Sequence, residues 1–169
     1  MTILVAGLIN IEITLRVESF PIHYNPVNYP FFGVNSSVSG VGYNVAKALT
    51  VLGDEVRFLS LVGQDPARTL VYEALRRAHI PAAHVLDQLE QTAHSVILYD
   101  RTGRRQINVD LKDIQEHDYP PDMFEAALAE SSLVVPCNIN FTRPFLRQAW
   151  QAGKPIATDV HAISDLEDA

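Results

Sequence analysis

The feature that most constrains the fold of this chain is an alternation between short apolar runs and stretches with apolar residues at helical spacing. The first run, Thr2–Leu8, is almost continuously apolar, which is typical of a strand buried on both faces. Similar runs occupy 56–63, 132–137 and 154–160, and helices are expected at 41–52, 66–78, 121–131 and 141–153. Strands that alternate with helices favour a parallel sheet with helices on both faces. The expected fold class is therefore a three-layer, Rossmann-like α/β fold.

Capping residues and apolar stripes define the first two helices. Ser39 and Asp65 stand at their expected N-caps, and Gly53 is a C-cap signal for the first helix. The stripe predicted to face the core in the first helix consists of Val41, Val45, Ala48, Leu49 and Leu52. The stripe of the second helix consists of Leu70, Val71, Ala74, Leu75 and Ala78.

Three further segments alternate apolar and polar residues, which is typical of strands with one face in water. They lie at 11–18, 31–38 and 94–110, and the last of them predicts a hairpin that turns at Asp100–Gly103. These segments predict a second, small sheet at one edge of the core. The insertions that carry it are expected at about 11–38 and 92–111.

Composition excludes several classes of function. The formal net charge of −7 argues against a nucleic-acid surface. Cys137 is the only cysteine, so an internal disulfide and a cysteine-rich zinc site are excluded, and the six histidines show no metal-binding spacing. The opening "MTILVAGLINIEITL" is too short and interrupted to span a membrane and lacks the basic region of a signal peptide. We therefore expect a cytoplasmic protein with no metal ligands of its own and no membrane partner.

Two glycines open the first helix, where backbone N–H groups are free and the helix dipole is positive. They are Gly40 and Gly42, and Asn44 adds an amide in the same turn. A dinucleotide fingerprint would need a third glycine where Val45 stands, so NAD binding is a weaker alternative, and a phosphate-binding P-loop lacks its lysine. Because no lysine or arginine stands between these residues, a neutral polyol suits them better than a charged phosphate.

Two stretches resemble the ribokinase-like, or PfkB, family of carbohydrate kinases. "SGVGYNVAKALTVLGDEVRFLSLVGQD" (39–65) is similar to the first signature of that family, and "GLINIE" (7–12) is similar to its opening segment. The resemblance implies that residues 1–169 are the N-terminal part of a ribokinase-like kinase domain. It also implies that the small sheet is a lid over the sugar and that the lid pairs in a homodimer.

The resemblance assigns roles to individual residues. Those implied to bind the acceptor substrate are Asn10, Glu12, Gly40, Val41, Gly42, Asn44 and Asn138, and those implied on the phosphate side are Asp159 and His161. Asn138 and Asn140 follow the run at 132–137, at the carboxyl edge where parallel sheets bind ligands. Glu12, Val41 and Asn138 replace an aspartate, a lysine and a glutamate of the ribokinase pattern, so the sugar stays undetermined.

The activity that the resemblance implies is phosphorylation of a sugar or nucleoside hydroxyl by ATP with Mg2+. The family's catalytic aspartate lies in a G-A-G-D motif, and no such motif occurs here, since Gly153 is the last glycine. We therefore predict no catalytic residue in this chain. Two accounts fit: the sequence is the N-terminal piece of a longer kinase, or it is a non-catalytic sugar-binding or dimerising module.

Overall fold

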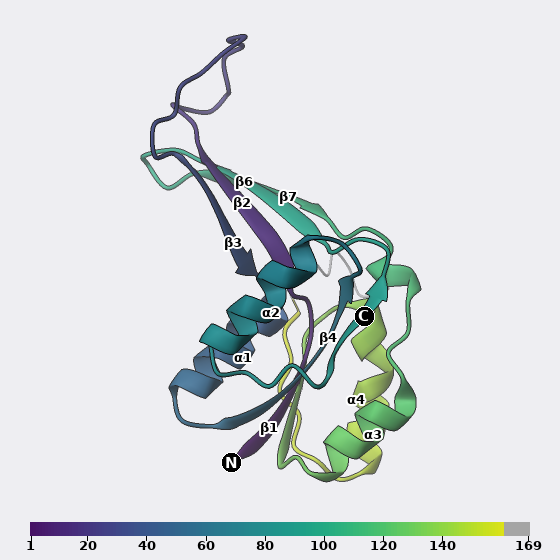
Figure 1. Ribbon diagram of the computed structural model, residues 1–169. Coiled ribbons are helices and arrows are strands. Elements are labelled where there is room, and N and C mark those ends of the chain that lie inside the picture. Colours follow the sequence, from purple (N-terminus) through teal and green to yellow (C-terminus); the bar gives the residue numbers. More distant parts are fainter. Residues whose placement is uncertain (161–169) are drawn as a thin grey trace.

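The core of the molecule is a sheet of four parallel strands in the order β5–β4–β1–β8 (Figure 1). The computed structural model describes residues 1–160. The strands are β1 (Thr2–Ala6), β4 (Glu55–Gly63), β5 (Val85–Leu89) and β8 (Leu133–Pro136). In register, Ile3 of β1 lies between Val56 of β4 and Leu133 of β8. The predicted parallel α/β sheet is confirmed.

Helices cover both faces of this sheet, as predicted (Figure 1). One face carries α1 (Val41–Val51) and α2 (Ala67–Arg77), and the other carries α3 (Pro121–Ala129) and α4 (Arg143–Gln151). Successive side chains of a strand point to opposite faces, so β1 contributes to two separate cores. Ile3 and Val5 are buried on the α1 and α2 side, whereas Leu4 and Ala6 are buried on the α3 and α4 side.

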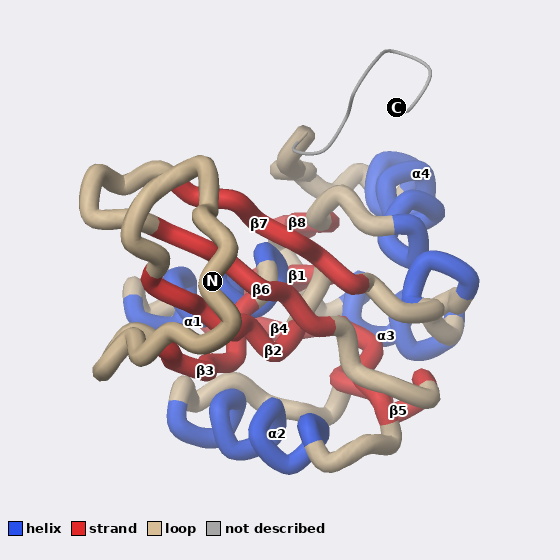
Figure 2. The backbone as a smooth tube through the Cα atoms, turned by 90° about the horizontal axis from the view of Figure 1, so that it is seen from above, coloured by secondary structure: helices blue, strands red, loops and turns tan. Residues whose placement is uncertain are grey.

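A second sheet lies across one end of the core sheet, in the order β3–β2–β6–β7 (Figure 2). Its strands are β2 (Asn10–Arg16), β3 (Val34–Ser39), β6 (His94–Tyr99) and β7 (Arg105–Asp110). β2 pairs with β3 antiparallel and with β6 parallel, and β6 and β7 form the predicted hairpin. The predicted small sheet is confirmed, and we call it, with its connecting loops, the lid. The loop 17–33 between β2 and β3 projects from its far end (Figure 1).

Local details of the first helix differ from the predictions. The N-cap of α1 is Gly40 instead of Ser39, and no side chain caps this end. Ala48 and Leu52 of the predicted stripe are exposed, and Tyr43 and Ala46 are buried in their place. The reason is that Gly42 rests directly on the backbone of Gly7, which fixes how the helix is rotated about its axis.

Other differences lie at the edges of the core sheet. β5 was not predicted from the sequence, because its residues Asp87 and Gln88 interrupt the apolar pattern. The strand expected at 154–160 is reduced to a single bridge between Val134 and Ile156. Leu70, which was predicted to face the core from α2, is 55% exposed.

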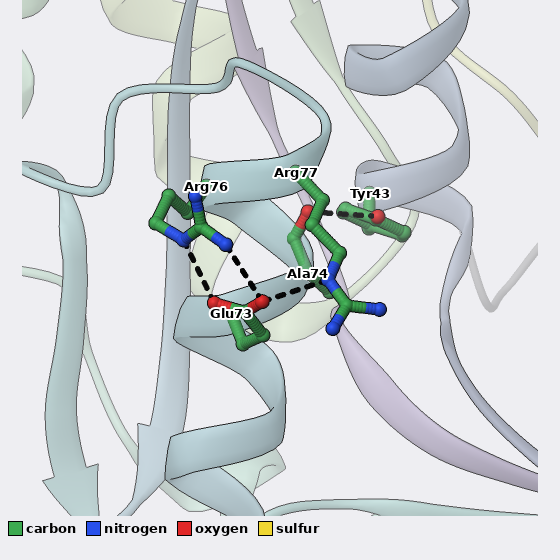
Figure 3. A network of polar contacts seen from close by, with 5 residues as sticks. All are labelled: Tyr43, Glu73, Ala74, Arg76 and Arg77. Atoms are coloured by element: carbon green, nitrogen blue, oxygen red, sulfur yellow. Dashed lines mark hydrogen bonds and ion pairs between the residues drawn. The ribbon is translucent and has the colours of Figure 1, made fainter.

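Polar contacts bind α1 to α2 and organise the outer face of α2 (Figure 3). The Tyr43 hydroxyl donates to the carbonyl oxygen of Ala74 at 3.4 Å. Glu73 accepts hydrogen bonds from Arg76 and Arg77, and these bonds lower its carboxyl pKa to about 2. Tyr43 is thus a core residue, and its contact with α2 supports the first turn of α1.

Candidate functional site

A cavity of about 450 Å³ lies between the lid and the carboxyl edge of the core sheet. Its walls come mainly from the start of β2, the turn from β3 into α1, the strands β6 and β7 with the segment after β7, and the segment that follows β8. The lining residues used below are Asn10, Glu12, Ser39, Gly40, Val41, Asn44, Ser95, Ile97, Ile107, Val109, Gln115, Cys137, Asn138, Asn140 and Arg143. Such a place, at the strand ends of a parallel sheet, is typical of ligand sites.

Six of the residues predicted for the site line this one cavity. They come from positions far apart in the sequence and are Asn10, Glu12, Gly40, Val41, Asn44 and Asn138. Gly42 lies beneath the cavity against Gly7, and Asp159 lies behind Asn138 without lining it. His161 lies outside the described residues.

The N-terminus of α1 presents free backbone donors to the cavity. Within residues 1–160, the N–H groups of Val41 and Gly42 have no acceptor, whereas the N–H of Tyr43 donates to the carbonyl of Leu8 at 3.2 Å. Unpaired N–H groups and the positive end of the dipole make such a helix start attractive to oxygen atoms of a ligand. The Asn44 Nδ2 donates to Ser39 Oγ at 3.3 Å, which holds the amide at the rim of this turn.

Both glycines are needed for the backbone to take this path. Gly40 has a φ of 110°, and a Cβ there would lie 2.4 Å from the carbonyl oxygen of Leu8. A Cβ on Gly42 would lie 2.6 Å from the carbonyl carbon of Gly7. Contacts this short are with backbone atoms, which have little freedom to move. The pair therefore brings the start of α1 onto the end of β1 and forms the floor of the cavity.

Asn10 and Glu12 enter the cavity from the first residues of β2. Asn10 is 4% exposed, and its Nδ2 donates to Ser95 Oγ at 3.1 Å. Its Oδ1 is buried without a hydrogen-bond partner among the described residues. Glu12 is half-buried and lies in register between Ser37 of β3 and Ser95 of β6. Asn10 and Glu12 therefore line one space, and an amide oxygen and a carboxylate both accept hydrogen bonds.

The end of β8 forms another wall of the cavity. The N–H of Cys137 donates to the carbonyl of Ala6, and the N–H of Asn138 donates to Oδ2 of Asp159 at 3.2 Å. Burial raises the pKa of the Cys137 thiol to about 12, and the negative charge of Asp159 adds to this effect. The thiol is therefore neutral and serves as an apolar part of the wall.

The sequence prediction missed several residues of the site. Arg143, the first residue of α4, brings a cation to the cavity. Asn140, which the sequence had placed at this edge of the sheet, also lines the cavity, and its N–H donates to Oε1 of Gln115 at 3.0 Å. From the lid come Ser95, Ile97, Ile107 and Val109. Their period of two along β6 and β7 was a usable signal, because alternate residues of a strand share one face.

Asp65 has a different role from the predicted helix cap. The N-cap position of α2 is Pro66, and the Asp65 carboxylate instead accepts two hydrogen bonds from Thr92, both at 2.9 Å. Burial acts to raise the pKa of Asp65, but the hydrogen bonds from Thr92 outweigh it and hold the pKa below its ordinary value of 3.8. This contact fixes the chain just before it enters the lid at His94.

The described residues do not provide a metal site. No group of three or more His, Cys, Asp or Glu side chains in residues 1–160 is arranged to hold a metal ion. Mg2+ prefers several oxygen ligands, and the carboxylate of Asp159, which accepts from the N–H of Asn138 just after β8, does not meet that need by itself. No helix in the described part is long and apolar enough to cross a membrane.

Comparison with known proteins identifies relatives of this fold. The model of the pfkB family carbohydrate kinases matches residues 2–150. No curated protein sequence matches the chain significantly. Among solved structures, ribokinase from Giardia lamblia is 22% identical with a TM-score of 0.81, over 98% of this chain and 52% of that chain.

Two further structures extend the comparison. Arabidopsis thaliana ribokinase, complexed with ribose and ATP, is 19% identical with a TM-score of 0.77, over 96% of this chain and 54% of that chain. Burkholderia thailandensis nucleoside kinase, complexed with inosine, is 16% identical with a TM-score of 0.71, over 94% of this chain and 52% of that chain. The chain thus spans about half the length of these relatives. From the family match over most of its length, we conclude that the chain belongs to the pfkB family of carbohydrate kinases.

Proposed function

We propose that this chain supplies the acceptor-binding half and the lid of a kinase that transfers phosphate from ATP to a hydroxyl of a sugar or nucleoside. The observation that carries the proposal is the single cavity shared by Asn10, Glu12, Asn44 and the free N–H groups at the start of α1. Two structural neighbours, a ribokinase and a nucleoside kinase, hold ribose and inosine, which are ligands of this class.

The chemistry of the cavity suits a polyhydroxylated guest. A hydroxyl donates to one group and accepts from another, so it needs acceptors and donors together. Glu12 and the Asn10 amide oxygen supply acceptors, and the N–H group of Val41 supplies a donor. Ile97, Ile107 and Val109 of the lid face the same space and suit the apolar C–H surface of a sugar ring.

The proposal assigns only the acceptor side to the described residues. They do not form an Mg2+ site, and the sequence contains no G-A-G-D motif, so no step of phosphate transfer is assigned to a residue here. Asp159 and His161 stay as proposed residues of the phosphate side. A cytoplasmic location, where ATP is available, fits the lone buried Cys137.

The lid gives the second part of the proposal, which is a homodimer formed through the loop 17–33. Large apolar side chains of this loop project into solvent, and the most exposed of them are Tyr24, Tyr29, Phe31 and Phe32. Clustered exposed aromatics mark contact surfaces more often than isolated ones do. Phe32 is 99% exposed and has a φ of 55°, a backbone conformation that costs energy in a non-glycine residue.

Calorimetric titration of the 169-residue chain tests the acceptor site. The ligands are ribose, fructose, glucose, inosine and adenosine, and the variants are Glu12→Gln and, as a matched control, Glu125→Gln on the exposed face of α3. Because hydrogen bonds to a charged group contribute about 1.5–3 kcal/mol, we expect Glu12→Gln to weaken binding about tenfold to a hundredfold. The control should bind like the unmodified chain. Equal binding by both variants contradicts the assigned role of Glu12.

Turnover separates the kinase from the alternative. The protein encoded by the whole reading frame is incubated with ATP, Mg2+ and the same ligands, and phosphorylated product is measured by mass spectrometry. Product from at least one ligand supports the kinase. Binding without product from any ligand supports the alternative, a non-catalytic sugar-binding or dimerising module. Neither binding nor product contradicts both.

A further inference from the structure

A hydrogen bond inside the lid controls how one side chain faces the cavity. Ser95 lies on β6, Asn10 opens β2, and each is 4% exposed. The Asn10 Nδ2 donates to Ser95 Oγ at 3.1 Å. Both residues line the cavity, so their contact is part of its wall. The two residues are separated by 85 positions in the sequence, and the contact exists only because β2 and β6 pair.

This bond determines which atom of the Asn10 amide is left for a ligand. An asparagine side chain carries an NH2 group with two donors and an oxygen with two acceptor sites. With Nδ2 on Ser95, the oxygen Oδ1 of this cavity-lining residue is buried without a partner among residues 1–160. Buried polar atoms without a partner are rare in native proteins, and each requires an explanation. A hydroxyl of a bound ligand provides one.

We propose that Ser95 is a positioning residue, which fixes the Asn10 amide so that Oδ1 accepts a hydrogen bond from a ligand hydroxyl. The ligand then needs a donor at this point, and a group that only accepts does not replace it. Because Ser95 belongs to the lid, the same bond links ligand recognition to the pairing of β6 with β2. The ligand's identity as a polyol rests on the proposed function, whereas the Ser95–Asn10 contact does not.

The first test needs no ligand. In the 15N-labelled chain, hydrogen exchange of the Asn10 side-chain NH2 is measured by NMR, and its signal is assigned by its loss in Asn10→Asp. We expect slow exchange in the unmodified chain and in Ser95→Thr, which keeps the hydroxyl. Exchange should be at least tenfold faster in Ser95→Ala. The matched control is Ser37→Ala, on the other side of β2 from Ser95 and exposed, which should leave the rate unchanged.

A purely structural serine would behave differently. If Ser95→Ala leaves the Asn10 exchange rate unchanged, the bond does not orient the amide and the inference is overturned. If Ser95→Ala unfolds the chain, the backbone signals of β2 and β6 collapse. In that case Ser95→Thr is compared with Ser95→Cys, whose thiol is a weaker hydrogen-bonding partner than a hydroxyl. Equal exchange rates of the Asn10 side-chain NH2 in these two variants would overturn the inference.

The second test uses the best-binding sugar or nucleoside of the panel and its deoxy and deoxyfluoro analogues. At the hydroxyl that faces Asn10, both replacements should weaken binding at least fivefold, because fluorine cannot donate. In Ser95→Ala this penalty should fall below twofold, and in Ser95→Thr it should return. Full affinity of every fluoro analogue would show that no ligand hydroxyl needs to donate to Asn10, and would overturn the inference. If no panel member binds the unmodified chain, the proposed function fails and the exchange measurement alone decides the role of Ser95.

Discussion

At the scale of single residues, Gly42 determines how closely α1 approaches β1. A Cβ at this position would lie 2.6 Å from the carbonyl carbon of Gly7, so Gly42→Ala must push the helix away from the strand. Overpacking of this kind costs about 1–3 kcal/mol. We therefore expect Gly42→Ala to lower the free energy of unfolding by this amount, as measured by urea denaturation. Ala48→Ser, at an exposed position of the same helix, is the control and should change it by about 0.5 kcal/mol or less. Equal stability of the two variants would contradict the backbone contact.

The thiol of Cys137 gives a second prediction at this scale. Burial, with the charge of Asp159, raises its pKa to about 12 from an ordinary value of 9.0. At pH 8 the thiolate, which is the reactive form, is then roughly a thousandfold rarer in the folded chain than in the unfolded chain. We expect labelling by iodoacetamide to be at least a hundredfold slower in buffer than in urea, as followed by mass spectrometry. Labelling rates within tenfold of each other would contradict the buried, neutral thiol.

Individual site residues were predictable where a local pattern marked them. Gly40 and Asn44 stand at the start of a helix that the sequence pattern predicts. Asn10 and Glu12 stand where a continuous apolar run is followed by alternating apolar and polar residues. Arg143 was not predictable in this way, because its place in the cavity depends on how α4 docks on the sheet. Asp65 was assigned a role that it does not have. Its sequence context suits an N-cap, but its carboxylate accepts two hydrogen bonds from Thr92, a residue distant in the sequence.

At the scale of elements, the contact between Asp65 and Thr92 links the end of β4 to the entrance of the lid. The Thr92 Oγ1 donates to Asp65 and accepts from the N–H of Gly63 at 3.0 Å, so one carboxylate orders two segments. We expect Asp65→Asn to lower the free energy of unfolding at pH 7 by about 1 kcal/mol. Glu90→Gln, at an exposed position near Thr92, is the control and should have no measurable effect.

The pH dependence of this contact follows from the direction of the pKa shift. The folded-state pKa of Asp65 lies below its ordinary 3.8, so its contribution to stability is complete above pH 3.8 and is lost as the pH falls through the folded-state pKa. The difference between the unmodified chain and Asp65→Asn should therefore be constant from pH 5 to 8 and shrink below pH 3.8. Urea titrations at pH 7, 5 and 3 measure it. A difference that grows on acidification would contradict the assignment.

Secondary elements were predictable to the extent that periodicity reports burial. Apolar and polar residues alternate along the lid strands, so β2, β6 and β7 were predicted. β5 is an edge strand with polar residues, and its pattern carries no such signal. In α1 the helix was predicted but its buried face was not, because the short contact between Gly42 and Gly7 decides the rotation and Tyr43 accordingly turns inward.

At the scale of the whole molecule, the cavity exists because two sheets meet. The core sheet brings the end of β8 and the start of α1 together. The lid adds β6 and β7, which lie about fifty residues after α1 in the sequence (Figure 2). Sequence patterns predicted both sheets and a place for the small one at an edge of the core, but not the contacts that hold the two sheets in position. That placement depends on tertiary contacts such as the packing of Ile11 of β2 into the core on the α1 and α2 side, which no local pattern records.

The proposed homodimer can be tested on the loop 17–33. Phe31 and Phe32 are 75% and 99% exposed, and transferring such side chains from water into an interface stabilises association. We expect a double substitution, Phe31→Glu with Phe32→Glu, to raise the dissociation constant of the dimer at least tenfold in sedimentation equilibrium. Trp150→Glu is the control, since Trp150 is an equally exposed aromatic on α4, away from the lid, at 75%. An unmodified chain that stays monomeric up to 100 μM, or a control that dissociates the dimer as strongly, would contradict pairing through this loop.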